Sequence, residues 1–498
     1  MKEMKKYIVF VAVLLVAMAT TPGCKKFLDT ESPTRESGAS FWKTRADAER
    51  FTNNLYGEMA DILLNNSFFL AAEFRCGLYR QTRVYPRDYF DWFPVNNIKS
   101  IVYGNNYWNG FFHFDRLIDW NPYFKIIQSA GILIDRAPGV PDSELSPEEK
   151  KQYVAEGVFV RNFCYFLMVR LYGDVPYYTK PYFDKVIGRS NFVEVLNQCI
   201  AELDKYKNDL PWSYPDPRKR AVRPTVGTMY ALMMHMNMWN AGFDDLNRGK
   251  YHEHAAALFK EFEGKNNGTY RLLTTAEFTR LFRGGSEEGL FEFSQNVNYG
   301  ELRGLGYQYL NDNVIRGGYD RPYLYLQKKF LEKMYPLSDP DKRRDIWFDG
   351  NMMSESRGEF LKFSGNRGSG SGYDGSLIVF RLADMYLLAA EANAELGSDR
   401  SEEAIRLLNV IRGRAEAPAY SGVTQRDLQD AIYWERTKEL MGEGHYFYDL
   451  VRTKRILNSE YCAFPISQPA FQRGAWTWPI TEEALKNNPL MRLNEYWR

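Results

Sequence analysis

The feature of this sequence that most restricts its fold is the return of apolar residues at helical spacing over long stretches. In residues 153–171 a broad apolar stripe recurs every three to five positions, wide enough to face a core. Comparable patterns predict helices over residues 42–63, 123–133, 192–210, 225–241 and 377–396. We therefore expect a mainly α fold.

Helix termini carry signals of their own further along the chain. Asp399 with Glu402, and Thr424 with Asp427, fit the capping box, in which two residues satisfy each other's backbone amides. The second pair precedes an expected helix over residues 428–440, and Gly397 suits the left-handed position after a helix. Small residues that permit close helix packing predict a tetratricopeptide-like stack, although no regular repeat of about 34 residues is visible. They are Ala383, Ala389, Ala390, Ala392 and Ala394.

Long segments without periodicity separate the helices. Residues 85–120 are rich in Tyr, Phe, Trp, Asn and Asp, residues 284–325 in Gly, Tyr and Asn, and residues 350–375 include a Gly/Ser-rich run. Long irregular segments inside a packed domain are usually functional or disordered. The aromatic content of the first two favours ordered loops displayed on a helical scaffold.

The N-terminus has the pattern of an export signal. Residues 1–6 are net basic, residues 7–19 are apolar, and Pro22-Gly23-Cys24 follows. The apolar run is shorter than the roughly 20 residues that a membrane-spanning helix needs. Gly23-Cys24 resembles a lipoprotein cleavage site, at which Cys24 becomes the lipidated N-terminus. Thr21 departs from the usual leucine, so a plain signal peptide is the alternative.

No catalytic residue, metal site or cofactor is predicted. Nucleotide-binding glycine loops, zinc-protease motifs and nucleophile elbows are missing. His252 and His254 have the spacing of metal ligands but no third ligand nearby, which favours a solvated helix face. Glu435 and Glu439 lie one helical turn apart, and we interpret them as partners of neighbouring arginines rather than as a glycosidase pair. Cys164 and Cys199 lie in apolar helical patterns, which predicts buried free thiols.

Composition favours a binding surface. Aromatic residues make up 16% of the 498-residue chain, and a formal net charge of +1 gives no basic field for nucleic acid. Sugars pack their C–H faces on aromatic rings and need planar polar partners for their hydroxyls. Within the aperiodic segments the predicted ligand-binding residues are Tyr89, Trp92, Tyr107, Trp108, Asn296, Tyr299, Tyr307 and Tyr319.

Several blocks in order then resemble the SusD/RagB family of outer-membrane nutrient-binding lipoproteins from Bacteroidetes. They are CKKFLD from Cys24, the helix ending in YGDVP at residues 172–176, RLADMYLLAAEA from Arg381, NVIRGRA from Asn409, ERTKEL from Glu435, GEGH from Gly442 with DLVR from Asp449, and WPI from Trp478 with Asn488-Pro489. The resemblance covers essentially the whole chain after the signal.

The resemblance implies a lipidated, outward-facing protein of the outer membrane that partners a SusC-like TonB-dependent transporter. It divides the chain into a signal peptide (1–23), a lipidated tether (24–40) and a body (41–498), with an N-terminal part over about 41–240 and a C-terminal part over about 270–498. Its motif residues are expected to hold helices together; they are Arg381, Asp384, Glu391, Arg412 and Glu435.

The expected function is capture of an oligosaccharide or polysaccharide for uptake. Three alternatives remain: a peptide-binding, RagB-like member of the same family, a lipid-anchored glycosidase, and a purely structural helical scaffold.

Overall fold

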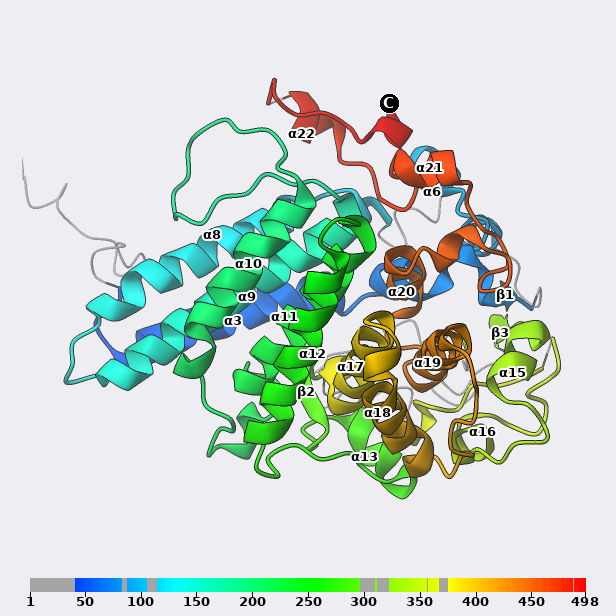
Figure 1. The fold of residues 1–498 in the computed structure, drawn as a ribbon. Helices are drawn as coiled ribbons and strands as arrows, with labels where there is room; N and C mark the ends of the chain where they lie inside the picture. The colour runs from blue at the N-terminus through cyan, green and yellow to red at the C-terminus, as the bar shows by residue number, and fades with distance from the viewer. Residues whose placement is uncertain are drawn as a thin grey trace, which may run out of the picture.

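A computed structural model describes residues 41–82, 87–104, 114–295, 310, 322–355, 357–366, 375–486 and 488–498. Within these residues the fold is mainly α, as predicted, and neighbouring helices stack side by side (Figure 1). The contacts run from α8 through α9, α10, α11 and α12 to α17, which also packs on α18 and α19. The longer helices are α3 (Arg45–Leu63), α8 (Asn121–Arg136), α9 (Pro147–Tyr172), α10 (Phe192–Tyr206), α11 (Val226–Phe243), α12 (Arg248–Lys265), α17 (Leu382–Glu395), α18 (Ser401–Arg414) and α19 (Gln425–Glu439).

Shorter helices occupy segments that lack visible periodicity in the sequence. Within residues 85–120 the structure places α5 (Asp88–Trp92), α6 (Ile98–Tyr103) and the single turn η3 (Phe114–Leu117). The remaining short helices are α4 (Asn66–Phe69), α13 (Phe278–Arg283), α15 (Lys328–Met334), α16 (Lys342–Trp347), α20 (Tyr446–Arg452), α21 (Gln468–Gln472) and α22 (Glu482–Lys486).

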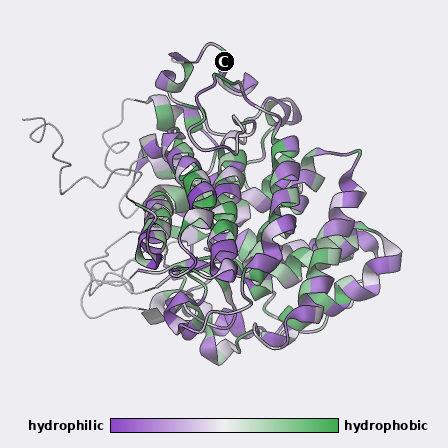
Figure 2. Ribbon diagram, turned by 90° about the vertical axis from the view of Figure 1, so that its left-hand side faces the viewer, coloured by the Kyte–Doolittle hydropathy of each residue, from purple (hydrophilic) through white to green (hydrophobic). Residues whose placement is uncertain are grey.

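The helical stack encloses an aromatic and aliphatic core. Hydrophobic residues gather where helices meet, and hydrophilic residues cover much of the outside (Figure 2). Helix α9 is buried around nearly its whole circumference from Tyr153 onward, because α8 and α10 both pack against it. Its first turn begins at Pro147, six residues before the predicted start, with Ser146 and Glu149 forming a capping box.

Two predictions of local structure are wrong. Residues 377–381 are not the start of a helix but the strand β4 (Leu377–Arg381), which pairs antiparallel with β2 (Gly289–Phe293). Asp399 does not cap α18, because residues 398–400 form a separate 3-10 turn and the helix begins at Ser401. The second sheet pairs β1 (Tyr79–Gln81) with β3 (Leu324–Leu326).

Other terminal signals are confirmed. Thr424 and Asp427 form the predicted capping box at the start of α19. Gly397 follows α17 with a φ of 102°, in the region that favours glycine. Cys164 and Cys199 are buried free thiols, and so are Cys76 and Cys462.

Candidate functional site

Helix α5 carries the two predicted ligand residues that the structure describes. Tyr89 is 1% exposed, and its ring packs edge-on against Phe114 with centroids 5.4 Å apart. Trp92 is half-buried and packs on the core with part of its surface exposed. Tyr89 therefore lies in the core, whereas Trp92 keeps a surface that a ligand can reach. Tyr107, Trp108, Asn296, Tyr299, Tyr307 and Tyr319 lie outside the described residues.

A cavity of about 930 Å³ opens beside the same aromatic-rich segment, between the end of α3 and the start of α8. The turn η3 contacts α4 and α6 and contributes Arg116 and Leu117 to the cavity lining. A volume of this size lies within the range of small-molecule sites, roughly 300–1,000 Å³. We refer to it as the α3–α8 cavity.

The lining of this cavity combines planar polar groups with apolar surface. The side chains of Arg116 and Asn121 line the cavity and form no hydrogen bond or ion pair with any other described residue. Asp119 adds a carboxylate, and Phe68 and Tyr123 supply ring surface. This combination matches what a sugar needs, namely polar partners for hydroxyls and an apolar surface for C–H faces.

Sequence reasoning missed the α3–α8 cavity because its polar residues come from separate segments. Asn65 follows α3, whereas Asn121 begins α8 and precedes the helix-starting Pro122. Their proximity depends on the packing of α3 against α8. The available signal was the polar end of the aromatic-rich segment, at Arg116 and Asp119, but nothing in the sequence pointed to the opposite wall.

The carboxylate pair on α19 belongs to a buried ionic network. Arg343 binds Glu435 at 2.5 Å and Glu439 at 2.8 Å, and Arg381 binds Glu439 at 2.7 Å. Burial alone would raise the pKa of Glu439, but Arg414, Arg381 and Arg343 hold it well below its ordinary value. The interpretation of the pair as arginine partners is confirmed. Neither carboxyl has the raised pKa that the general acid of a glycosidase needs.

The remaining motif residues hold helices together, as expected. Arg381 also binds Glu443 at 2.7 Å and Glu288 at 2.8 Å, so it joins β4 to the segments before β2 and α20. Glu391 on α17 is bridged to Arg452 at the end of α20, with Nη2 to Oε2 at 2.8 Å. Arg412 on α18 binds Glu435 at 3.1 Å.

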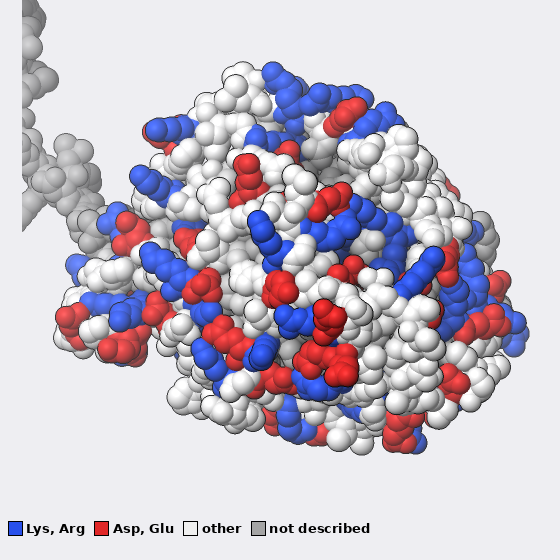
Figure 3. Space-filling model, viewed as in Figure 1, with Lys and Arg blue, Asp and Glu red and all other residues white. Residues whose placement is uncertain are grey.

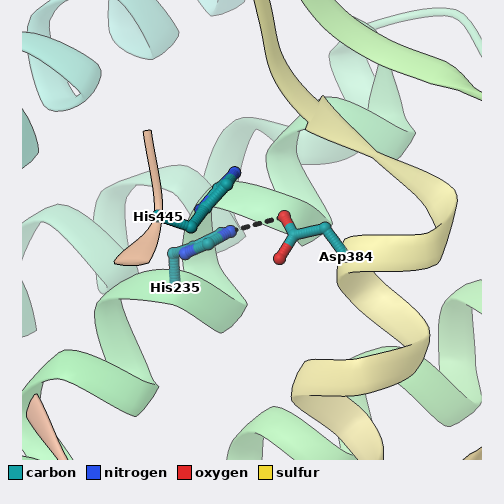
Figure 4. Close-up of side chains that lie close together, drawn as sticks. All are labelled: His235, Asp384 and His445. Carbon is teal, nitrogen blue, oxygen red and sulfur yellow. Dashed lines mark hydrogen bonds and ion pairs between the residues drawn. The ribbon is translucent and has the colours of Figure 1, made fainter. Parts of the chain in front are cut away.

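His235, Asp384 and His445 meet in the core, where potential metal-ligating atoms lie within 4.8 Å of one another (Figure 4). His235 Nε2 lies 2.7 Å from Asp384 Oδ2, and Arg436 Nη1 donates to Asp384 Oδ1 at 2.6 Å. Burial would raise the pKa of Asp384, but His235 and Arg436 hold it well below its ordinary value. Because Arg436 already neutralises this carboxylate, the cluster is built as a hydrogen-bonded core network and is poorly suited to a divalent cation.

The second histidine pair lies on α12. His252 is 5% exposed, which contradicts the predicted solvated face, and burial lowers its pKa to about 4. His254 is half-buried and its Nδ1 lies 3.1 Å from Asn237 Oδ1. The error arose because α12 packs on both α11 and α17, so more of its circumference faces protein than a single-sided helix would present.

Stacked helices, an ionic core and open surface cavities define a helical binding protein. The profile of the SusD family matches residues 350–497, and a profile described as starch-binding associating with outer membrane matches residues 26–236. A crystal structure of a SusD homolog from Bacteroides thetaiotaomicron is 33% identical, with a TM-score of 0.83, over 92% of this chain and 100% of that one. The chain belongs to the SusD family.

Two curated relatives come from Formosa agariphila. SusD-like protein P38 is 24% identical over 99% of this chain and 99% of its own length. SusD-like protein P25 is 25% identical over 68% of this chain and 70% of its own length. As a member of this family, the chain has a role in glycan binding and nutrient uptake in association with the outer membrane. Members of the family are generally non-catalytic binding proteins. Among the described residues, none of the helices combines the length and apolarity that crossing a membrane requires.

Proposed function

We propose that this protein is a lipid-anchored, outward-facing component of the outer membrane that captures oligosaccharide and delivers it to a SusC-like TonB-dependent transporter. In this proposal residues 1–23 are removed, Cys24 carries the lipid, and residues 24–40 tether the body to the membrane. The ligand meets the protein on the surface formed by the aromatic-rich segments and the α3–α8 cavity.

One observation carries the proposal beyond family membership. The α3–α8 cavity presents the side chains of Arg116 and Asn121 without partners among the described residues, beside the segment that holds Trp92. A polar group that lacks a protein partner at a cavity wall is available to a ligand hydroxyl. The buried carboxylates of the α19 network are neutralised by arginines, which supports binding without hydrolysis.

Binding of the purified protein to a polysaccharide panel, followed by calorimetry with the oligosaccharides that bind, tests this function. Replacing Trp92 by Ala should reduce affinity by about 1–3 kcal/mol, because a stacking aromatic contact is lost. Trp212→Ala is the matched control: Trp212 is also half-buried, but it packs against Tyr230 and Phe262 far along the chain from both aromatic segments. Its affinity should equal that of the wild type.

Three results would contradict the proposal. Steady release of reducing sugar would indicate a glycosidase, and binding of peptides but no glycan would indicate a RagB-like function. A protein that binds nothing on the panel would indicate a scaffold.

A further inference from the structure

A second cavity, of about 860 Å³, lies on another part of the molecule. It is bounded by the turn after α9, the end of α11, helix α21 and the C-terminal segment. None of its lining residues lines the α3–α8 cavity. We refer to it as the C-terminal cavity, and its volume admits a ligand of a few sugar rings.

Positive charge distinguishes this cavity. Its lining holds five basic side chains and three acidic ones: Arg189, Lys454, Arg473, Arg492 and Arg498 against Asp174, Asp245 and Glu495. Asp245 is already engaged by Lys454 at 3.0 Å and by Arg248. Basic side chains gather at the top of the view in Figure 3, where the C-terminal segment lies in Figure 1.

The arginines of this cavity lack the carboxylate partners that three core arginines have. Arg343, Arg381 and Arg436 in the core each bind at least two carboxylates. In contrast, among the described residues no carboxylate lies within ion-pair distance of the four arginines that line the C-terminal cavity, which are Arg189, Arg473, Arg492 and Arg498.

Arg189 is the most enclosed of the four. Its Nη1 donates to the carbonyls of Tyr172 at 3.1 Å and Asp174 at 3.0 Å and to Asn494 Oδ1 at 2.9 Å. Its Nε and Nη2 are buried without a hydrogen-bond partner among the described residues. Burial lowers its pKa to about 10, so it stays charged at neutral pH. Its guanidinium carbon lies 5.2 Å from the centre of the Trp120 ring, and Asp174 is a nearby negative charge that favours its charged form. An anion bound in the cavity would add to this partial compensation.

Two of the arginines that line the cavity, Arg473 and Arg492, are exposed. Arg492 Nη1 donates to the carbonyls of Pro489 and Met491, both at 2.7 Å, which holds this guanidinium in place. Arg473 follows directly after α21. Phe192 and Phe243 present half-buried rings to the same cavity. Guanidinium groups thus face a site that also offers apolar ring surface.

We propose that the C-terminal cavity is a second ligand site, which binds a small saccharide through an oxyanion group, a carboxylate or a sulfate, on its ring. Guanidinium forks match the planar geometry of carboxylate and can also donate to the oxygens of a tetrahedral oxyanion such as sulfate. The phenyl rings contact the C–H face of the sugar. The site is independent of the glycan surface at Trp92.

Calorimetry on the full-length protein in detergent tests this site with three probes: glucuronate, glucose 6-sulfate and glucose. We expect both anions to bind at least ten times more tightly than glucose and to weaken as salt is raised. The stronger of the two identifies the oxyanion. Hydrogen exchange should show protection within residues 173–192 and 468–498 when the anion is bound.

The double variant Arg473→Gln/Arg492→Gln should lower anion affinity at least tenfold, and both positions are exposed, so the fold is preserved. Arg218→Gln, which removes an 89% exposed arginine outside the cavity, should have no effect. Trp92→Ala should leave anion binding unchanged, which separates this site from the glycan surface. Equal binding of glucose and glucuronate, no binding of either anion, or unchanged affinity in the double variant would overturn the proposal.

Discussion

Arg381 shows how much of the stability of this fold depends on single charged side chains in the core. It is 1% exposed and binds Glu288, Glu439 and Glu443, all of which are buried. Replacing Arg381 by Met should lower the free energy of unfolding by about 3–5 kcal/mol, because three buried carboxylates then lose a positively charged partner. Denaturant unfolding followed by circular dichroism measures the loss.

Arg406 on α18 provides the control for this prediction. It binds Glu403 at 2.7 Å and Glu263 at 2.9 Å, but its side chain is 45% exposed. Arg406→Met should therefore cost less than about 1 kcal/mol. Equal losses in the two variants would show that the buried network contributes no more than surface ion pairs.

The sequence predicted the role of such residues better than it predicted ligand contacts. Residue types and helical spacing suffice to predict that Glu435 and Glu439 pair with arginines, and both bind Arg343. Tyr89 and Trp92 are both aromatic residues of the same aperiodic segment, so the sequence does not distinguish them. In the structure the Tyr89 ring packs in the core against Phe114, whereas the Trp92 ring is partly exposed. Which of two aromatic rings faces outward depends on the packing of α5, and composition carries no information about that.

At the scale of elements, Gly242 sets how closely α11 approaches α20. A Cβ on Gly242 would lie 2.1 Å from the backbone oxygen of Arg452, so even one methyl group has no room. Gly242→Ala should lower the free energy of unfolding by about 1–3 kcal/mol, because the two helices must separate. Thermal or denaturant unfolding measures the effect.

Gly57→Ala is the matched substitution in an open environment. Gly57 lies inside α3, and a methyl group added there would meet no atom within 4 Å. At this position alanine should raise the free energy of unfolding by roughly 0.5–1 kcal/mol, because it favours the helix over the unfolded chain. Opposite signs for the two variants are expected, and a stabilising Gly242→Ala would refute the close-packing argument.

Helix ends that are marked by neighbouring residues could be predicted from the sequence, whereas a strand that pairs with a segment far along the chain could not. The capping box at Thr424 lies within four residues, and the structure contains it. Residues 377–381 continue the apolar pattern of α17, but they pair with Gly289–Phe293, about ninety positions earlier in the chain. Helical periodicity cannot reveal a strand whose partner is so distant, and the α3–α8 cavity escaped prediction for the same reason.

At the scale of the whole molecule, the proposed function depends on where the body is held. The described structure begins at residue 41, and the proposed lipid site, Cys24, precedes it by seventeen positions. A fully extended tether of that length spans roughly 60 Å. Such a tether would keep both cavities close to the membrane, where captured ligand must be handed to a transporter.

Replacing Cys24 by Ala should release the protein from the outer membrane without changing its binding surface. Because Cys24 carries the acyl chains in this proposal, and these chains supply the membrane anchoring, the variant should lose both labelled-palmitate incorporation and sedimentation with the outer membrane. In solution its affinity for the bound oligosaccharide should match that of the wild type, since the body after residue 40 is unchanged. Lys26→Ala, which alters a neighbour and keeps the cysteine, should retain both lipid and location. Palmitate labelling of Cys24→Ala at the wild-type level would refute the assignment of Cys24 as the anchor. A wild-type protein that incorporates no palmitate would favour the plain signal peptide instead.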